Sequence, residues 1–359
     1  MENNDTLLSP GQRIRPHATI ETASDLLEKI YGLTAVNIYE LNAYDDKNYH
    51  VYCKKSEENP HIPIINEHGY VLKIINSLDS RKTDVIEAQT KMLIFLNRYF
   101  ACPVPVKTLA GTYYSLEKLT ESGETHAVRL LIYRPGQLLT RVSWSQELLY
   151  KIGRFTAEVD LRLSGFYHPA YEHHRTMWML VSVPKLRRFV FAVKDENREH
   201  LANEVIDAFE REVLKIVPNL AQGIIHGDLN EQNILVNPEG TDIVAVIDFG
   251  DSQKTCLVFE LAIVICYMLL ERGEIGAGKH VIEGYQSTRK LTDLEKKVLR
   301  VSVCARICQS LVMGAYSHFQ DPQNNYLLIT QKTGWTLLQK LWPMSEEEIS
   351  RVWNLSSPN

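Results

Sequence analysis

The chain has 359 residues, of which 45% are hydrophobic and 23% charged, and its formal net charge is −5. This composition is typical of a globular protein with two domains or lobes. The acidic balance gives no electrostatic reason to expect nucleic-acid binding. No uninterrupted apolar run approaches the roughly 18 residues that a membrane span needs. The six cysteines form no CxxC pair. We therefore expect a reduced, cytoplasmic protein with no nucleic-acid and no membrane partner.

The first third of the chain predicts a small sheet accompanied by helices. Alternating apolar residues indicate strands, and apolar residues at helical spacing indicate helices. The predicted elements are, in order, a helix at 22–33, strands at 35–44, 48–55 and 69–76, a helix at 84–100 and a strand at 126–136. The last strand ends at a Pro-Gly dipeptide, which marks a turn or linker.

Beyond this dipeptide the pattern is mainly helical. We predict helices near 145–164, 199–216, 255–271, 292–315 and 323–341, with short strands at 233–237 and 243–250. The expected class is α+β, with a small antiparallel-sheet N-lobe and a mainly helical C-lobe. The expected divisions are a polar N-terminal tail at 1–17, an N-terminal lobe at 18–133 and a C-terminal lobe at 134–359.

Two charged residues of the N-terminal lobe have the types that nucleotide binding requires. Lys73 lies on the strand "YVLKI", and Glu87 lies on the helix that follows. A cation on a strand can neutralise nucleotide phosphates if a carboxylate holds it in place, which is the role we expect of Glu87. Taken alone, each residue is more often an ordinary surface group.

The C-terminal lobe supplies the remaining groups in "HGDLNEQN" (226–233) and "VIDFGD" (246–251). Asp228 can orient a hydroxyl group and accept its proton, and Asn233 and Asp248 offer the oxygen ligands that Mg²⁺ prefers. His226 is expected to support the loop by hydrogen bonding. Together with the upstream lysine, this spacing predicts a phosphoryl-transfer site.

A small molecule is the expected phosphate acceptor. The N-terminal lobe has no G-x-G-x-x-G loop, and only a few residues separate "DFGD" from the apolar helix at 255–271. This interval has no room for the activation segment of a protein kinase. The segment "GEIGAGKH" (273–280) nearly matches a P-loop, but it ends in His280 and follows a helix, so we expect a helix end and a loop there.

The order of V-L-K, helical Glu, Y-R-P-G, H-G-D-L-N-x-x-N-I-L and I-D-F-G-D resembles the aminoglycoside phosphotransferase/choline kinase superfamily. These small-molecule kinases have the protein-kinase-like two-lobe fold. Within the superfamily, the chain is similar to the hydroxylysine kinase group, from about residue 18 to 355. The segments that carry this similarity include 44–52, 128–136, 258–263, 308–317 and 332–335.

The resemblance implies transfer of the γ-phosphate of GTP, or of ATP, to the side-chain hydroxyl of 5-hydroxy-L-lysine in lysine breakdown, with Mg²⁺. Asp228 then matches the catalytic base, Asn233 and Asp248 match the metal ligands, and Lys73 matches the phosphate-binding lysine. Asn48, expected in the hairpin turn, matches the position that covers the phosphates. The backbone from Leu131 to Tyr133 would bind the nucleotide base.

Hydroxylysine carries two ammonium groups and a carboxylate, which suggests further substrate residues. Asp251 and Glu260, and also Asp45 and Asp46 if the hairpin tip folds over the site, could offer negative charge. Arg306 could grip the carboxylate through a bidentate pair. Each has a structural alternative: turn chemistry for the hairpin aspartates, and a buried ion pair for the arginine.

Other functions remain open at this level. A choline, ethanolamine, homoserine or aminoglycoside kinase would share the same motifs. A nucleotide-binding scaffold without activity is the non-enzyme alternative.

Overall fold

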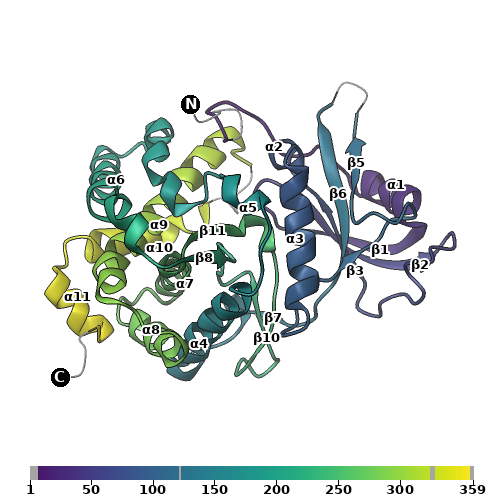
Figure 1. Cartoon of the computed structure of the whole chain (residues 1–359). Coiled ribbons are helices and arrows are strands. Elements are labelled where there is room, and N and C mark those ends of the chain that lie inside the picture. Colours follow the sequence, from purple (N-terminus) through teal and green to yellow (C-terminus); the bar gives the residue numbers. More distant parts are fainter. Residues whose placement is uncertain (1–6, 121–122, 324–327, 356–359) are drawn as a thin grey trace. The chain divides into compact units, whose positions relative to one another are not determined.

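The computed structural model describes residues 7–120, 123–323 and 328–355 (Figure 1). The chain divides into two compact units, residues 1–135 and 136–359, so that the division falls inside the Arg-Pro-Gly segment. Gly136 has a φ of 155°, and a Cβ at this position would lie 2.9 Å from the Cβ of Leu235. A glycine is therefore needed where the second unit begins.

Unit 1, residues 1–135, is built around one antiparallel sheet. Its elements are α1 (Ile20–Tyr31), β1 (Leu33–Leu41), β2 (Lys47–Lys55), β3 (Tyr70–Ile74), α2 (Ser77–Ser80), α3 (Thr83–Leu96), β4 (Pro105–Val106), β5 (Ser115–Lys118) and β6 (Thr125–Ile132). The strand order is β1-β2-β3-β6-β4, and β5 also pairs with β6.

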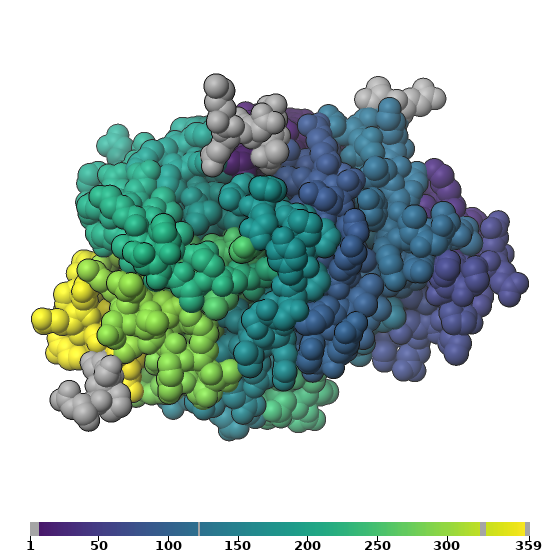
Figure 2. Space-filling model, viewed as in Figure 1, coloured from purple at the N-terminus to yellow at the C-terminus, as the bar shows by residue number. Residues whose placement is uncertain are grey.

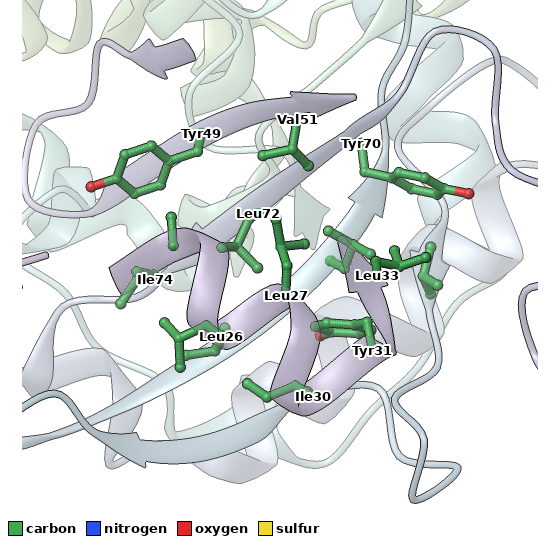
Figure 3. Packing of buried hydrophobic residues seen from close by; sticks show 14 of the residues in the cluster. Leu26, Leu27, Ile30, Tyr31, Leu33, Tyr49, Val51, Tyr70, Leu72 and Ile74 are labelled. Atoms are coloured by element: carbon green, nitrogen blue, oxygen red, sulfur yellow. The ribbon is translucent and has the colours of Figure 1, made fainter. Parts of the chain in front are cut away.

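The core of unit 1 lies between α1 and one face of the sheet, as Figure 3 shows. Leu27 of α1 and Leu72 of β3 are both fully buried there. Because side chains alternate between the two faces of a strand, the neighbours of these core residues point to the other face. Asn48, Lys73 and Arg129 lie directly opposite one another on β2, β3 and β6, so they form one polar row on that other face.

The N-terminal segment differs from the expected polar tail. Leu7, Leu8 and Ile14 are buried, and the carbonyl of Ile14 accepts a hydrogen bond of 2.9 Å from the backbone N–H of Ser77. The described part of the segment therefore contributes apolar side chains to the fold, which its overall polarity concealed. Residues 1–6 lie outside the described residues.

Unit 2, residues 136–359, is mainly helical, which confirms the predicted fold class. Its strands are β7 (Gln137–Leu138), β8 (Gln222–Ile225), β9 (Ile234–Val236), β10 (Ile243–Val246) and β11 (Gln253–Cys256). They form two small antiparallel sheets, β10-β9-β7 and β11-β8. Its α-helices are α4 (Gln146–Leu163), α5 (Ala170–His173), α6 (Glu196–Ala208), α7 (Leu257–Arg272), α8 (Ala277–Thr288), α9 (Asp293–Gln320), α10 (Gln331–Leu341) and α11 (Glu346–Trp353).

Helices α7 and α9 form the centre of unit 2. By length and composition, α9 could cross a membrane. We did not expect this from the sequence, because charged residues interrupt its apolar residues. However, 89% of its most apolar 18-residue window is buried within the protein, as expected of a core helix. In the space-filling view of Figure 2, side chains fill the spaces between the ribbons of this unit.

Helix α8 corrects another expectation. The helix before "GEIGAGKH" does end at Gly273, which takes the left-handed conformation (φ 68°). The chain then starts a new helix at Ala277, so Lys279 and His280 lie in its first turn and not in a loop.

Candidate active site

The loop between β8 and β9 carries the predicted catalytic residue. Two tight turns shape it, because the N–H of Asn230 donates to the carbonyl of Asp228 at 2.9 Å and the N–H of Asn233 donates to the carbonyl of Asn230 at 3.1 Å. The side chains of all three residues are thereby brought to one side of the loop. We call residues 226–233 the catalytic loop.

Three donors hold the carboxylate of Asp228. Its Oδ2 accepts hydrogen bonds from the side-chain amides of Asn230 and Asn233, each at 2.9 Å. Its Oδ1 accepts a bond of 2.8 Å from Nη2 of Arg306. Burial raises the pKa of Asp228 to about 6, against the lowering effect of the Arg306 charge. The group is ionised at neutral pH but more basic than an exposed aspartate, which suits a proton acceptor.

The two predicted metal ligands lie at neighbouring strand ends. The carbonyl of Asn233 accepts a hydrogen bond of 2.9 Å from the N–H of Ile247, which connects the catalytic loop to the segment after β10. Asp248 follows in a left-handed conformation (φ 57°), and its carboxylate accepts from the N–H of Gly250 at 3.3 Å. The amide nitrogen of Asn233 faces Asp228, so its amide oxygen can ligate a cation. The carboxylate of Asp248 is exposed and is also a ligand type that Mg²⁺ prefers.

His226 is a supporting residue of the loop, as predicted. Its Nε2 bonds to the carbonyl of Ile247 at 3.0 Å, and its Nδ1 accepts from the backbone N–H of Asp228 at 3.2 Å. Burial lowers the pKa of His226 to about 4. The ring is therefore neutral, with its proton on Nε2, and does not exchange protons with a substrate at neutral pH.

Glu260 does not have the predicted substrate role. It lies on α7 with no exposed surface, and its carboxylate accepts hydrogen bonds from the backbone N–H groups of His226 and Gly227. Burial raises the pKa of Glu260 well above its ordinary value. Its function in the fold is to fasten the catalytic loop to α7, a contact across 34 residues that no local pattern reveals.

Arg306 is likewise not available to grip a substrate carboxylate. Only 1% of the residue is exposed, and its guanidinium group is bonded to Asp228, to the carbonyl of Trp178 at 2.9 Å and to Oε1 of Gln309 at 3.0 Å. The structural alternative, a buried ion pair, is confirmed. Its partner, however, is Asp228, the predicted catalytic base.

Asp251 is half-buried, and its backbone carbonyl accepts a hydrogen bond of 3.1 Å from the side-chain amide of Gln253. A Cβ on Gly227 would overlap this same carbonyl, so the segment after β10 packs closely on the catalytic loop. A substrate role for the Asp251 carboxylate stays a prediction.

In unit 1, Lys73 has a carboxylate beside it that the motifs did not indicate. Lys73 lies 3.2 Å from Oδ2 of Asp46, and both side chains are largely buried. Glu87 lies outside the buried face of α3, pairs with Lys91 at 2.6 Å and is 54% exposed, whereas Gln89 lies on the buried face of the helix. The role of Glu87 in holding Lys73 stays a prediction.

The hairpin tip is folded onto the sheet. Oδ1 of Asp46 accepts hydrogen bonds from the backbone and side-chain nitrogens of Asn76, at 2.8 and 3.1 Å. The neighbouring Asp45 is half-buried, and burial together with nearby Asp46 and Asp79 raises its pKa to about 7. Asp46 is thus occupied inside unit 1, contrary to its predicted substrate role. A substrate role for Asp45 stays a prediction.

Asn48 lies in β2, one residue inside the strand, and not in the turn. It is opposite Lys73 and 9% exposed, and its buried Oδ1 has no hydrogen-bond partner within the described chain. Such an oxygen is costly to leave unsatisfied. It is therefore well placed to receive a donor from a ligand beside Lys73.

The predicted base-binding segment is tied into the sheet. Leu131 is buried in β6, and the N–H groups of Ile132 and Tyr133 donate to the carbonyls of Val104 (2.8 Å) and Gly69 (3.2 Å). The ring of Tyr133 stacks on His50 with centroids 3.8 Å apart. These two amides are therefore not free to read a nucleotide base.

Each unit holds part of the chemistry that phosphoryl transfer needs. Unit 1 has a buried cation beside an unsatisfied amide oxygen. Unit 2 has the carboxylate of Asp228 and two side chains with oxygen atoms suited to a divalent cation. Among the residues that the structure describes, no three His, Cys, Asp or Glu side chains form a metal cluster. A cation here would take its remaining ligands from a bound phosphate or water, which is usual for Mg²⁺. These are the groups that a kinase uses to transfer phosphate to a hydroxyl group.

Comparisons with known proteins agree with this class. Residues 57–294 match the model of the family described as "Phosphotransferase enzyme family". A hydroxylysine kinase from Xenopus laevis is 38% identical over 94% of this chain and 94% of its own length. One from Bos taurus is 36% identical over 94% of this chain and 93% of its own length. An amicoumacin kinase structure matches with a TM-score of 0.69 and 15% identity, over 92% of this chain and 97% of its own.

The chain belongs to this phosphotransferase family of small-molecule kinases, and hydroxylysine kinases are among its full-length relatives. The fold class and the family resemblance inferred from the motifs are thereby confirmed.

Proposed function

We propose that the protein transfers the γ-phosphate of GTP to the side-chain hydroxyl of 5-hydroxy-L-lysine, in the cytoplasm and as a step of hydroxylysine breakdown. The observation that carries the choice of acceptor is the near-full-length similarity to hydroxylysine kinases at 36–38% identity. A cytoplasmic location is supported by six cysteines that are all free thiols.

In this reaction, different residues of the chain bind the nucleotide phosphates and activate the acceptor hydroxyl. Lys73, held by Asp46, binds the nucleotide phosphates, and the amide of Asn48 assists beside it. Asp228 accepts a hydrogen bond from the acceptor hydroxyl, aligns its oxygen with the phosphorus atom and takes its proton as the new P–O bond forms. The acceptor oxygen gains the phosphoryl group, and the nucleoside diphosphate leaves with the electrons of the broken bond.

The side-chain oxygens of Asn233 and Asp248 fit Mg²⁺, because both are hard ligands. When bound, such an ion neutralises charge on the transferred phosphate. In the protein alone, these two residues have a further function: Asn233 holds Asp228, and Asp248 shapes the turn that follows β10.

A phosphate-transfer screen tests the acceptor and the donor together. Hydroxylysine, choline, ethanolamine, homoserine and kanamycin are each offered with GTP and with ATP, and nucleoside diphosphate release is measured. We expect turnover of hydroxylysine with GTP to exceed every other combination. Turnover of choline or homoserine without turnover of hydroxylysine would reject the proposed acceptor, and faster turnover with ATP would reject the proposed donor.

Asp228→Asn tests the catalytic base. The amide keeps the size of the side chain but cannot take the proton, so turnover should fall by at least about 100-fold. Nucleotide binding, measured by calorimetry, should change little because the phosphate-binding lysine is intact. Unchanged turnover would reject Asp228 as the base.

A further inference from the structure

The catalytic loop contains no cation of its own. Between His226 and Asn233 the sequence is G-D-L-N-E-Q, which has neither lysine nor arginine. Even so, the half-buried carboxylate of Asp228 is neutralised, because the buried Arg306 reaches it from the middle of α9 at 2.8 Å. The two residues are 78 positions apart in the chain.

Arg306 is held rigidly. Its guanidinium group packs 5.2 Å from the ring centroid of Trp178 and 5.4 Å from that of Tyr267, and it donates to the carbonyl of Trp178. Gln309, one turn further along α9, bonds to the carbonyls of Met177 at 2.6 Å and Met179 at 3.2 Å. Bonds from two residues of one buried helix therefore fix the segment 177–179 and the guanidinium together.

Rigidity at this point matters for the carboxylate. The χ2 torsion of an aspartate is broad, so a carboxylate has no preferred orientation unless both oxygens are held. Asn230 and Asn233 hold Oδ2, and Arg306 is the donor to Oδ1. The arginine also offsets the cost of burying the negative charge.

We propose that Arg306 is the positioning residue of Asp228 in phosphoryl transfer, fixing from α9 the orientation in which the carboxylate meets the acceptor hydroxyl. The inference rests on the proposed role of Asp228, but not on the identity of the acceptor. It replaces the predicted role of Arg306 as a ligand of the acceptor's carboxylate.

The test compares Arg306→Met with a matched control, Arg300→Met. Arg300 lies on the same helix, 5.5 Å from the ring of Trp342, and donates to the carbonyl of Trp342 at 3.0 Å. It thus shares with Arg306 the contact with a tryptophan ring and the bond to a tryptophan carbonyl, although it is half-buried, and no bond joins it to Asp228. Both variants are assayed with the acceptor that the wild-type enzyme phosphorylates best, so the proposed acceptor can fail without affecting this comparison.

We expect Arg306→Met to lower kcat by roughly 100-fold, as a misplaced catalytic group does, while the KM for nucleotide stays near the wild-type value. Arg306→Lys should regain part of that loss, since it restores a charged donor. Arg300→Met should leave kcat near the wild-type value. Equal losses of kcat in the two Met variants, or no regain in Arg306→Lys, would overturn the proposal.

A double-mutant cycle supplies a readout that needs no turnover. Arg306→Met leaves the half-buried carboxylate of Asp228 without its cation, so adding Asp228→Asn should raise the Tm above that of Arg306→Met alone. Strictly additive losses of Tm would show that the two residues act independently and would overturn the proposal. If Arg306→Met does not fold, the cycle and the kinetics are measured with Arg306→Gln, which also lacks the charge, and are judged by the same criteria.

Discussion

Gly227, the glycine of the catalytic loop, should not tolerate replacement by a residue with a side chain. Its φ is 84°, and a Cβ would overlap the backbone carbonyl of Asp251 and lie 2.9 Å from Nε2 of Gln253. Gly227→Ala therefore adds backbone strain of about 1–2 kcal/mol and a steric overlap that no rotamer change relieves. The loop must shift by an amount on the order of 1 Å, which is enough to lower kcat about 100-fold.

Gly273→Ala is a control that adds backbone strain without a steric overlap. Gly273 has a φ of 68° at the end of α7, but a Cβ there would meet no atom within 4 Å. This control should lower the Tm by about 2–4 °C per kcal/mol of strain and leave kcat unchanged. Thermal unfolding and steady-state kinetics measure both variants. A Gly227→Ala enzyme with wild-type kcat, or one no less stable than Gly273→Ala, would refute the reasoning.

Two further variants and a pH series test other contacts. Asp46→Asn should raise the nucleotide KM, on the order of tenfold, and more than Glu87→Gln, because Asp46 is largely buried beside Lys73 and Glu87 is exposed; equal effects would contradict the greater importance of Asp46. Burial lowers the pKa of His226 to about 4, against about 6.5 in the unfolded chain. The neutral, buried ring therefore makes its full contribution to the free energy of unfolding above pH 6.5. About 2 kcal/mol of this should be lost by pH 5, since the unfolded state binds the proton first. Urea unfolding at pH 7 and 5 should show a smaller loss for His226→Gln.

Sequence patterns predicted the parts of the site that local chemistry decides. Asp228 and Asn233 are five residues apart on one loop, so their side chains could be expected to meet, and the structure brings them to 2.9 Å. Glu87 lies on the exposed side of α3, and helical spacing alone did not show which side of the helix meets the sheet. The burial of Gln89, two residues further on, would have indicated the orientation of α3 only if the packing of the sheet had been known.

The remaining errors concern contacts between distant segments. Glu260 and Arg306 were charged residues in apolar helices, which indicated that each needed a partner, and ligand binding was one explanation. Their partners are the backbone and the carboxylate of the catalytic loop, 34 and 78 residues away. Only the packing of α7 and α9 on that loop determines such pairs. The bond from Asn230 to Asp228 likewise depends on the turn that the loop adopts, which the sequence alone does not show.

The dependence of Asp228 on α9 also has a consequence for protein synthesis. The ribosome makes the catalytic loop first and Arg306 78 residues later, a delay of roughly 4–16 s at ordinary elongation rates. During that interval the nascent chain carries the aspartate without its cation, and α7 emerges without the apolar helix that packs against it. A fragment that ends before α9 should therefore be both inactive and prone to aggregate, even though it contains every residue of the phosphoryl-transfer motifs.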